Sequence, residues 1–291
     1  MSGAVAKNLR DELLADREAV ALRYPEMFAT DRRSRVTTLA IVGFAVALYV
    51  FGLFALDISP LRIVNGLDRL MHIVGLMFPP TPTSWSRFWI YLHALGQTLS
   101  IAFLGTMVAA LLGIPLGFLA AKNIVANRIL HFLARRSLDT VRSVDTLIWA
   151  LIWINVVGLG PFAGALAIAS SDLGAFGKLM SEAIETADRK PVEGVTSTGG
   201  TRFEVIRFGI LPQVLPIFAS QVLYFFESNT RSATIIGIVG AGGIGLYLSE
   251  QIRVLEWEQV SFLIIMVLIT VAGIDIISQN LRAAIMGGRR S

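Results

Sequence analysis

The sequence predicts an all-α protein that crosses a membrane several times. Of its 291 residues, 54% are hydrophobic and 16% are charged, whereas charged residues make up about a quarter of an average soluble domain. The runs 36–56 and 94–121 carry no charge, and each reaches the ~20 residues that a helix needs to cross a bilayer. Backbone groups inside lipid must bond internally, which helices achieve. We therefore expect about six transmembrane helices.

Composition also removes several classes of site. The chain contains no cysteine, which excludes disulfides, thiol catalysis and cysteine-bound zinc. Its three histidines, His72, His93 and His131, lie in separate segments, so we expect no metal and no cofactor. The net charge of +4 comes with arginines placed beside apolar runs, a pattern typical of membrane topology. We expect the lipid bilayer, and no nucleic acid, as its surroundings.

Residues 1–35 are predicted to form a cytoplasmic, amphipathic N-terminal segment. They are charged and lack an apolar stretch of signal-peptide length. Arg33 and Arg35 stand next to the following apolar run, and basic flanks tend to face the cytoplasm. Residues 36–57 are thus expected to be the first transmembrane anchor helix, running outward.

Residues 58–92 are expected to lie at the extracytoplasmic surface. Leu67, Leu70 and Val74 recur at helical spacing, which suits a helix lying flat in the interface. Prolines follow it, and then come aromatic residues typical of a membrane-interface belt: Trp85, Trp89 and Tyr91.

Residues 93–282 are predicted to hold the remaining transmembrane helices. Gly158, Gly160 and Pro161 break one of them, because proline removes a backbone donor and glycine frees the chain. The glycine-rich segment 232–249 is expected to dip into the membrane and return, since irregular backbone there must be buried in protein. The arginine-bearing tail 283–291 then lies in the cytoplasm, as the N-terminus does. The expected spans are 93–121, 143–157, 162–184, 212–226 and 258–281.

A polar loop at residues 185–208 interrupts these apolar runs. Gly199 and Gly200 suit a tight turn, and Glu193 is expected near a helix start, where its charge offsets the helix dipole. The loop is predicted to be a helix–turn–helix that ends where Pro212 opens the next span. An apolar knob is expected at its tip with basic residues at the rim: Phe203 and Ile206, with Arg202 and Arg207.

The spacing in this loop resembles the cytoplasmic coupling loop of ATP-driven importer membrane subunits, written EAA-x3-G-x9-I-x-LP. Glu193, Gly199 and the Leu211-Pro212 pair match it, whereas Gly194 and Val195 replace its two alanines and Gly209 replaces its isoleucine. The resemblance implies a type I ABC importer transmembrane fold with a cytoplasmic coupling helix. It also assigns the coupling contacts to Glu193, Gly194, Gly199, Gly200, Arg202, Phe203, Ile206, Leu211 and Pro212.

Most of the remaining chain, roughly residues 90–282, is similar to the permeases of phosphonate transport. The stretches that carry the resemblance are DTLIWALIWINVVGLGPFAGALAI (145–168), GAFGKLMSEAIE (174–185) and ILPQVLPIFASQVLYFFESNTRSATIIGIVGAGGIG (210–245). It implies an inner-membrane permease for phosphonate, or for phosphite or phosphate. The implied partners are an ABC nucleotide-binding subunit that hydrolyses the ATP, an extracytoplasmic phosphonate-binding protein and a second copy of the permease. The chain itself is then not an enzyme.

Polar residues next to the apolar runs are candidates for the translocation pathway. A guanidinium at Arg231 suits an anionic substrate, but an Arg231–Glu227 pair four residues apart also explains both residues as structural. Ser170 and Ser171 can line a pathway or bond neighbouring helices. Asn229 is grouped with the pathway residues for its place beside the same apolar runs.

The segment Gly240-Ala241-Gly242-Gly243-Ile244-Gly245 matches a dinucleotide-binding pattern in its letters alone. That pattern requires a strand before it and a helix after it, and here membrane segments flank it. Close helix packing, or a gate at Gly240, Gly242 and Gly243, remain as its two interpretations. The competing function is a secondary carrier for a small anion, driven by an ion gradient, since such carriers also contain broken helices.

Overall fold

The computed structural model describes residues 32–56, 59–125 and 127–287. Most of the predicted N-terminal segment and the end of the basic tail lie outside them. The chain divides into two compact units, residues 1–71 and 72–291. In the first unit, helix α4 (Arg32–Ala55) buries none of its apolar window, as expected of a helix whose surroundings are lipid. The amphipathic helix α5 (Pro60–Leu76) follows where an interfacial helix was predicted.

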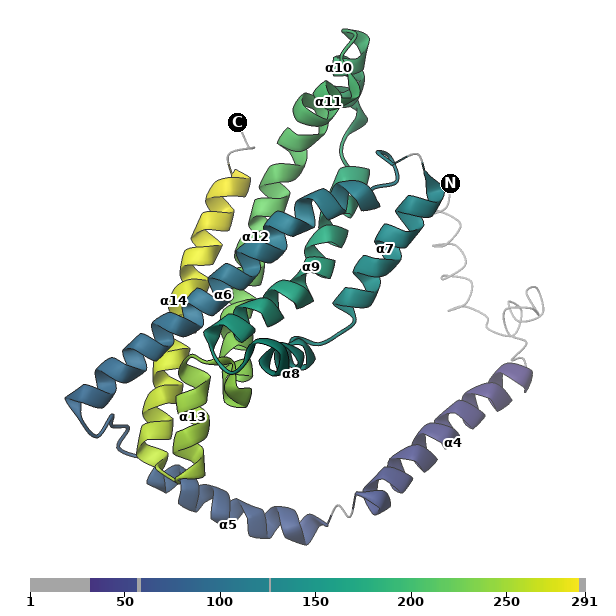
Figure 1. The fold of residues 1–291 in the computed structure, drawn as a ribbon. Helices are drawn as coiled ribbons and strands as arrows, with labels where there is room; N and C mark the ends of the chain where they lie inside the picture. The colour runs from purple at the N-terminus through teal and green to yellow at the C-terminus, as the bar shows by residue number, and fades with distance from the viewer. Residues whose placement is uncertain (1–31, 57–58, 126, 288–291) are drawn as a thin grey trace, which may run out of the picture. The chain divides into compact units, whose positions relative to one another are not determined.

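The second unit is built from helices alone among its described residues (Figure 1). Its long helices are α6 (Trp85–Ala120), α9 (Pro161–Glu185), α12 (Leu211–Ile236) and α14 (Trp257–Gly287). Shorter elements connect or extend them: α7 (Arg128–Arg142), α8 (Thr146–Val157), α10 (Arg189–Ser197), α11 (Arg202–Glu204), the π-helical turns η1 (Val205–Ile210) and η2 (Gly237–Ala241), and α13 (Ile244–Arg253).

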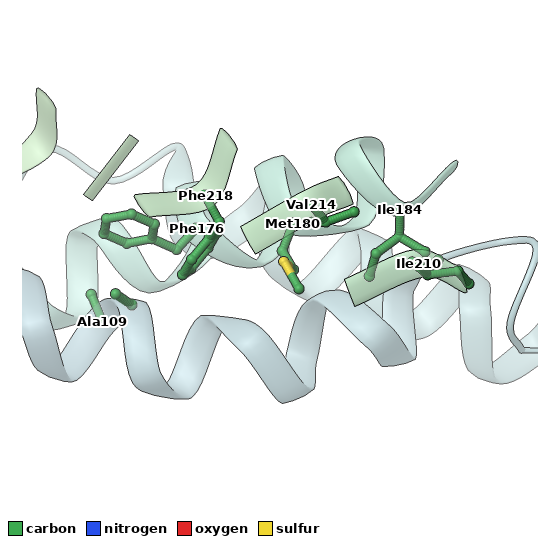
Figure 2. Packing of buried hydrophobic residues seen from close by; sticks show 9 residues of the cluster. Ala109, Phe176, Met180, Ile184, Ile210, Val214 and Phe218 are labelled. Atoms are coloured by element: carbon green, nitrogen blue, oxygen red, sulfur yellow. The ribbon is translucent and has the colours of Figure 1, made fainter. Parts of the chain in front are cut away.

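The core consists of three apolar clusters that follow one another along α6. Near the start of α6, Tyr91 and Ala94 pack with Ile244 and Leu263. In the middle, Ile101 and Ala102 pack with Ile168, Ile236 and Ala241. Near its end lies the cluster drawn in Figure 2: Ala109, Ala110, Ala121, Phe176, Met180, Ile184, Ile210, Val214 and Phe218. The order of partners means that α9 runs parallel to α6, whereas the stretch 202–253 runs antiparallel to both.

Small residues on α6 allow α9 to lie against it. A Cβ added at Gly113 would stand 2.6 Å from Cβ of Phe176, and one at Gly117 would stand 2.5 Å from Cβ of Met180. Because two helices pack most closely where one presents no side chain, these positions set the separation of α6 and α9.

Four described helices are long and apolar enough to cross a membrane, or five if α7 and α8, bent by 88°, form one span. Six were predicted. The difference lies in α9, which carries Asp172, Lys178 and Glu182 and is too polar to qualify by composition. It is enclosed by α6, α7, α8 and α12, so protein rather than lipid forms most of its surroundings.

The stretch after the coupling loop differs most from expectation. Residues 202–239 form one continuous helical run, which ends where Gly240 adopts φ +103°, so Pro212 does not open a helix and the span does not end at Phe226. The predicted dip and return of 232–249 is also wrong. After a break at Gly242 and Gly243, α13 continues in the direction of α12. The break is tolerated because Oγ1 of Thr98 accepts a hydrogen bond from the N–H of Ile244, at 2.8 Å.

Helix α6 begins earlier than the predicted span, which was expected to start at residue 93. Its first turn is capped by Ser84, whose Oγ accepts from the N–H of Arg87 at 3.3 Å, so the helix starts at Trp85. Trp85 and Trp89 are exposed, as a membrane-interface position requires. Tyr91 is buried instead, and its hydroxyl donates to Gln259 of α14.

Candidate functional site

The predicted coupling loop contains the expected turn between two helical segments (Figure 1). Gly199 has φ +82°, a left-handed conformation that favours glycine. Its N–H donates to the carbonyl of Thr196 at 3.0 Å, and the N–H of Gly200 donates to that of Val195 at 3.1 Å. These two backbone hydrogen bonds together form a Schellman C-cap. Thr201 and Glu204 then form a capping box that starts the next helix.

The start of the first loop helix was misplaced. Glu193 lies in the middle of α10 and is exposed, whereas Asp188 caps the helix by accepting from the N–H of Lys190 at 3.1 Å. The motif spacing drew attention to Glu193, but an aspartate directly before a helix is the commoner capping residue.

Gln213, which sequence reasoning did not single out, attaches α10 to α12, and Gly209 lets the two segments approach. The side-chain amide of Gln213 accepts from the N–H of Asp188 at 3.0 Å and donates to the carbonyls of Asp188, at 3.1 Å, and Gly209, at 2.6 Å. A Cβ at Gly209 would stand 3.2 Å from Cα of Val192. The glycine that departs from the family motif therefore lets α10 lie close to η1.

The predicted apolar knob is divided between two environments. Phe203 is 69% exposed, and Phe208 is also exposed, with the guanidinium of Arg207 5.4 Å from its ring centroid. Ile206 turns inward and packs against the cluster near the end of α6. Arg202 borders a pocket of about 400 Å³ whose other lining residues are Lys122, Asn123, Ile124, Thr196, Gly200, Val205, Ile206 and Ile210.

The motif's Leu-Pro pair lies within the helical run. Leu211 is half-buried and Pro212 is exposed. The N–H of Leu211 bonds the carbonyl of Ile206 in the wider π pattern. Because proline cannot donate to the preceding turn, a π turn directly before it allows the helix to continue.

The end of α9 is tied to the chain that follows α6. Glu185 accepts from Arg135 at 3.1 Å and from the backbone N–H of Lys122 at 2.8 Å. Asn123 donates to the carbonyl of Ile184 at 2.9 Å. The coupling loop thus begins from a helix end that is fixed on two sides.

A buried polar contact joins three helices deeper in the unit. Asn229 of α12 donates to Thr106 of α6 at 2.8 Å and to Asp172 of α9. All three side chains are buried. The amide of Asn229 is therefore engaged in holding helices together, which was not predicted, rather than lying open beside a pathway.

A second polar cluster lies between α12 and α14. Glu227 forms the predicted pair with Arg231, at 3.5 Å, and a shorter one with Arg282, at 3.0 Å. Sequence reasoning missed Arg282 because 55 residues separate it from Glu227. Arg231 is the most exposed of the three.

The two serines considered for the pathway lie between α8 and α9. Ser170 accepts from the indole N–H of Trp153, and Ser171 accepts from the hydroxyl of Thr146, both at 2.9 Å. Both contacts fit the alternative of hydrogen bonds between helices.

The glycines at 240–243 contact the break at residues 158–161, between α8 and α9. The N–H of Gly160 donates to the carbonyl of Gly240 at 3.0 Å. A Cβ at Gly242 would stand 2.9 Å from Pro161, and one at Gly243 would collide with Thr98. This geometry fits close packing, the first of the two interpretations of the segment.

Comparisons with known proteins agree with this architecture. The family model described as "Binding-protein-dependent transport system inner membrane component" matches residues 113–286. The phosphite transport system permease protein PtxC of Stutzerimonas stutzeri is 35% identical over 244 residues, which cover 84% of this chain and 87% of that protein. The phosphate-import permease protein PhnE of Mycolicibacterium smegmatis is 33% identical over 255 residues, which cover 87% of this chain and 47% of that protein.

Among solved structures, a chain of the MetNI methionine ABC transporter in inward-facing conformations superimposes with a TM-score of 0.61 at 18% identity. The match covers 69% of this chain and 99% of that chain. This confirms the predicted type I importer fold.

Proposed function

Because the chain belongs to the family of binding-protein-dependent transport system inner membrane components, we propose that it imports a phosphorus oxyanion through a pathway along its helices. The family is one of multi-pass inner-membrane permeases, which work with a separate ATPase and a binding protein. The proposed substrate is phosphonate, phosphite or phosphate. Its support is the identity to permeases named for phosphite and phosphate and the likeness to phosphonate permeases over residues 90–282.

The coupling loop is the proposed contact with the ATPase. Its tip exposes Phe203 and Phe208 beside Arg202 and Arg207, and large apolar side chains at a polar surface are suited to a protein partner. The Gln213 contacts and the continuous helical run 202–239 provide a stiff connection from this tip to the membrane. Motion of the ATPase would thereby reach α12.

The pathway is proposed to run beside α12, with Arg231 and Glu227 as its polar contacts. The glycines Gly240, Gly242 and Gly243 serve in packing around its outer part, and Asn229, Ser170 and Ser171 support the helices around it. We further propose that two copies of the chain assemble, with both termini in the cytoplasm, as the basic residues beside the spans favour.

Reconstitution tests the function. Vesicles that contain this chain, its ATPase subunit and its binding protein should accumulate phosphonate, phosphite or phosphate only when ATP is supplied. Vesicles with the chain alone should show no uptake under an imposed proton or sodium gradient. Uptake by the chain alone would favour the secondary carrier, and ATP-driven uptake of an unrelated solute but none of the three oxyanions would refute the substrate.

A further inference from the structure

The cluster of Glu227, Arg231 and Arg282 contains more positive than negative charge. One carboxylate faces two guanidinium groups, which leaves a formal charge of +1. The other buried carboxylate on the helices around α12, Asp172, lies against Asn229 and not in this cluster. The residual charge therefore belongs to the surface between α12 and α14.

This charge lies on helices that are long and apolar enough to cross a membrane: Glu227 and Arg231 within residues 202–241, and Arg282 within residues 257–285. Asn229 bonds Thr106, near the middle of the 36-residue helix α6, and Arg231 follows Asn229 by two residues. A charged side chain within a transmembrane helix faces a water-filled cavity or another protein rather than lipid.

The two arginines are not equivalent. Arg282 makes the shorter pair with Glu227, its side chain is 24% exposed, and its guanidinium lies 5.9 Å from the ring centroid of Tyr224. Arg231 makes the longer pair and is 49% exposed. Among the described residues, Glu227 is the acidic group that Arg231 contacts. Arg282 thus neutralises most of the carboxylate, and the unbalanced charge resides on Arg231.

We propose that Arg231 contacts the oxyanion during translocation, and that Arg282 is a positioning residue that keeps Arg231 available by neutralising Glu227. A guanidinium can bond two oxygens of such an anion at once. The permease would then select for negative charge itself, in addition to the selection made by the binding protein. The proposal rests on the proposed function, because it assumes an anionic substrate.

Charge deletions in the complete complex test it, with ATP-driven oxyanion uptake as the measurement. Arg231→Gln should lower uptake about tenfold or more, the size expected for a charge-assisted hydrogen bond. Arg282→Gln should lower it by a similar factor, because Glu227 then pairs with Arg231. The double variant Glu227→Gln with Arg282→Gln should recover most of the uptake. Glu227→Gln should not rescue Arg231→Gln.

The rescue separates the proposal from a packing role. If Arg282 only holds α14 against α12, removing Glu227 as well gives no recovery, and that result overturns the proposal. Arg136→Gln on α7, far from this cluster in the chain, is the matched control and should leave uptake unchanged. Size-exclusion chromatography with the ATPase measures how much of each variant assembles.

A second measurement covers the case in which Arg282→Gln does not assemble. Glu227→Gln alone raises the cluster's formal charge to +2, so the KM for the oxyanion should fall severalfold while turnover slows. An unchanged or higher KM overturns the proposal. Uptake by the wild-type complex distinguishes the two hypotheses. If the wild type shows no uptake, the proposed function is refuted. If the wild type and the charge variants are equally active, only the role of Arg231 is refuted.

Discussion

The turn in the coupling loop and the break between η2 and α13 both rely on glycine, but for different physical reasons. Gly199 has φ +82°, and nothing lies within 4 Å of the position that its Cβ would occupy. Gly243 has φ +73°, and its Cβ would collide with the hydroxyl of Thr98. The loop turn needs only a permitted backbone conformation, whereas the break also needs the absence of a side chain. The end of the 202–253 stretch that adjoins the coupling loop is thus held by hydrogen bonds and left open, and its other end is held by close packing.

The largest effect is expected where that packing is tightest. A Cβ at Gly245 would collide with the backbone carbonyl of Thr234, which cannot move without disturbing the helix. We expect Gly245→Ala to destabilise the permease by about 3 kcal/mol, at the upper end for overpacking. Thermal unfolding of the detergent-solubilised complex measures it.

Gly96→Ala in α6 is the matched control, because nothing lies within 4 Å of its Cβ position. Replacing an unpacked helix glycine by alanine should stabilise by about 0.5–1 kcal/mol. Equal unfolding temperatures for the two variants would contradict the packing interpretation of the break.

A smaller effect is expected at the polar contact between the two ends. Asn229→Leu leaves the buried carboxyl group of Asp172 without its amide donor, which should cost about 2–3 kcal/mol. Replacing Asp172 as well, as Asp172→Leu with Asn229→Leu, should recover much of that loss, because no buried polar group is then left unpaired. If the free energy of unfolding of the double variant falls by the sum of the two single losses, the contact does not hold α9 to α12.

Features that depend on neighbouring residues could be predicted from the sequence. The break at Gly158–Pro161, the turn at Gly199 and the pair Glu227–Arg231 all arise within a few positions of the chain. The partners that complete these features are distant, and no local pattern indicates them. Arg282 reaches Glu227 across 55 residues, and Gln213 reaches Asp188 across 25.

The same limit explains the misplaced end of the fifth span. The polar stretch 227–231 indicates the end of a membrane helix when the chain is considered alone. In the fold, α6, α9 and α14 supply hydrogen-bond and ion-pair partners for Asn229 and Glu227. The helix therefore continues to Ile236, since buried polar groups are tolerated where they are bonded.

The smallest effect on stability is expected in the coupling loop. Gln213→Leu removes the amide that joins Asp188 to α12, but these groups are exposed and water can replace it. The free energy of unfolding should fall by about 1 kcal/mol. ATP-driven uptake should fall severalfold, because α10 is no longer firmly attached to α12. Gln221→Leu, at a half-buried position of the same helix, is the control and should retain uptake.

Amide hydrogen exchange distinguishes the possible outcomes, because it reports local opening separately from global unfolding. Faster exchange in α10 together with reduced uptake is the expected result. Faster exchange with full uptake would mean that force reaches α12 through η1 alone. The open, hydrogen-bonded end of the molecule would then tolerate loosening that its tightly packed far end does not.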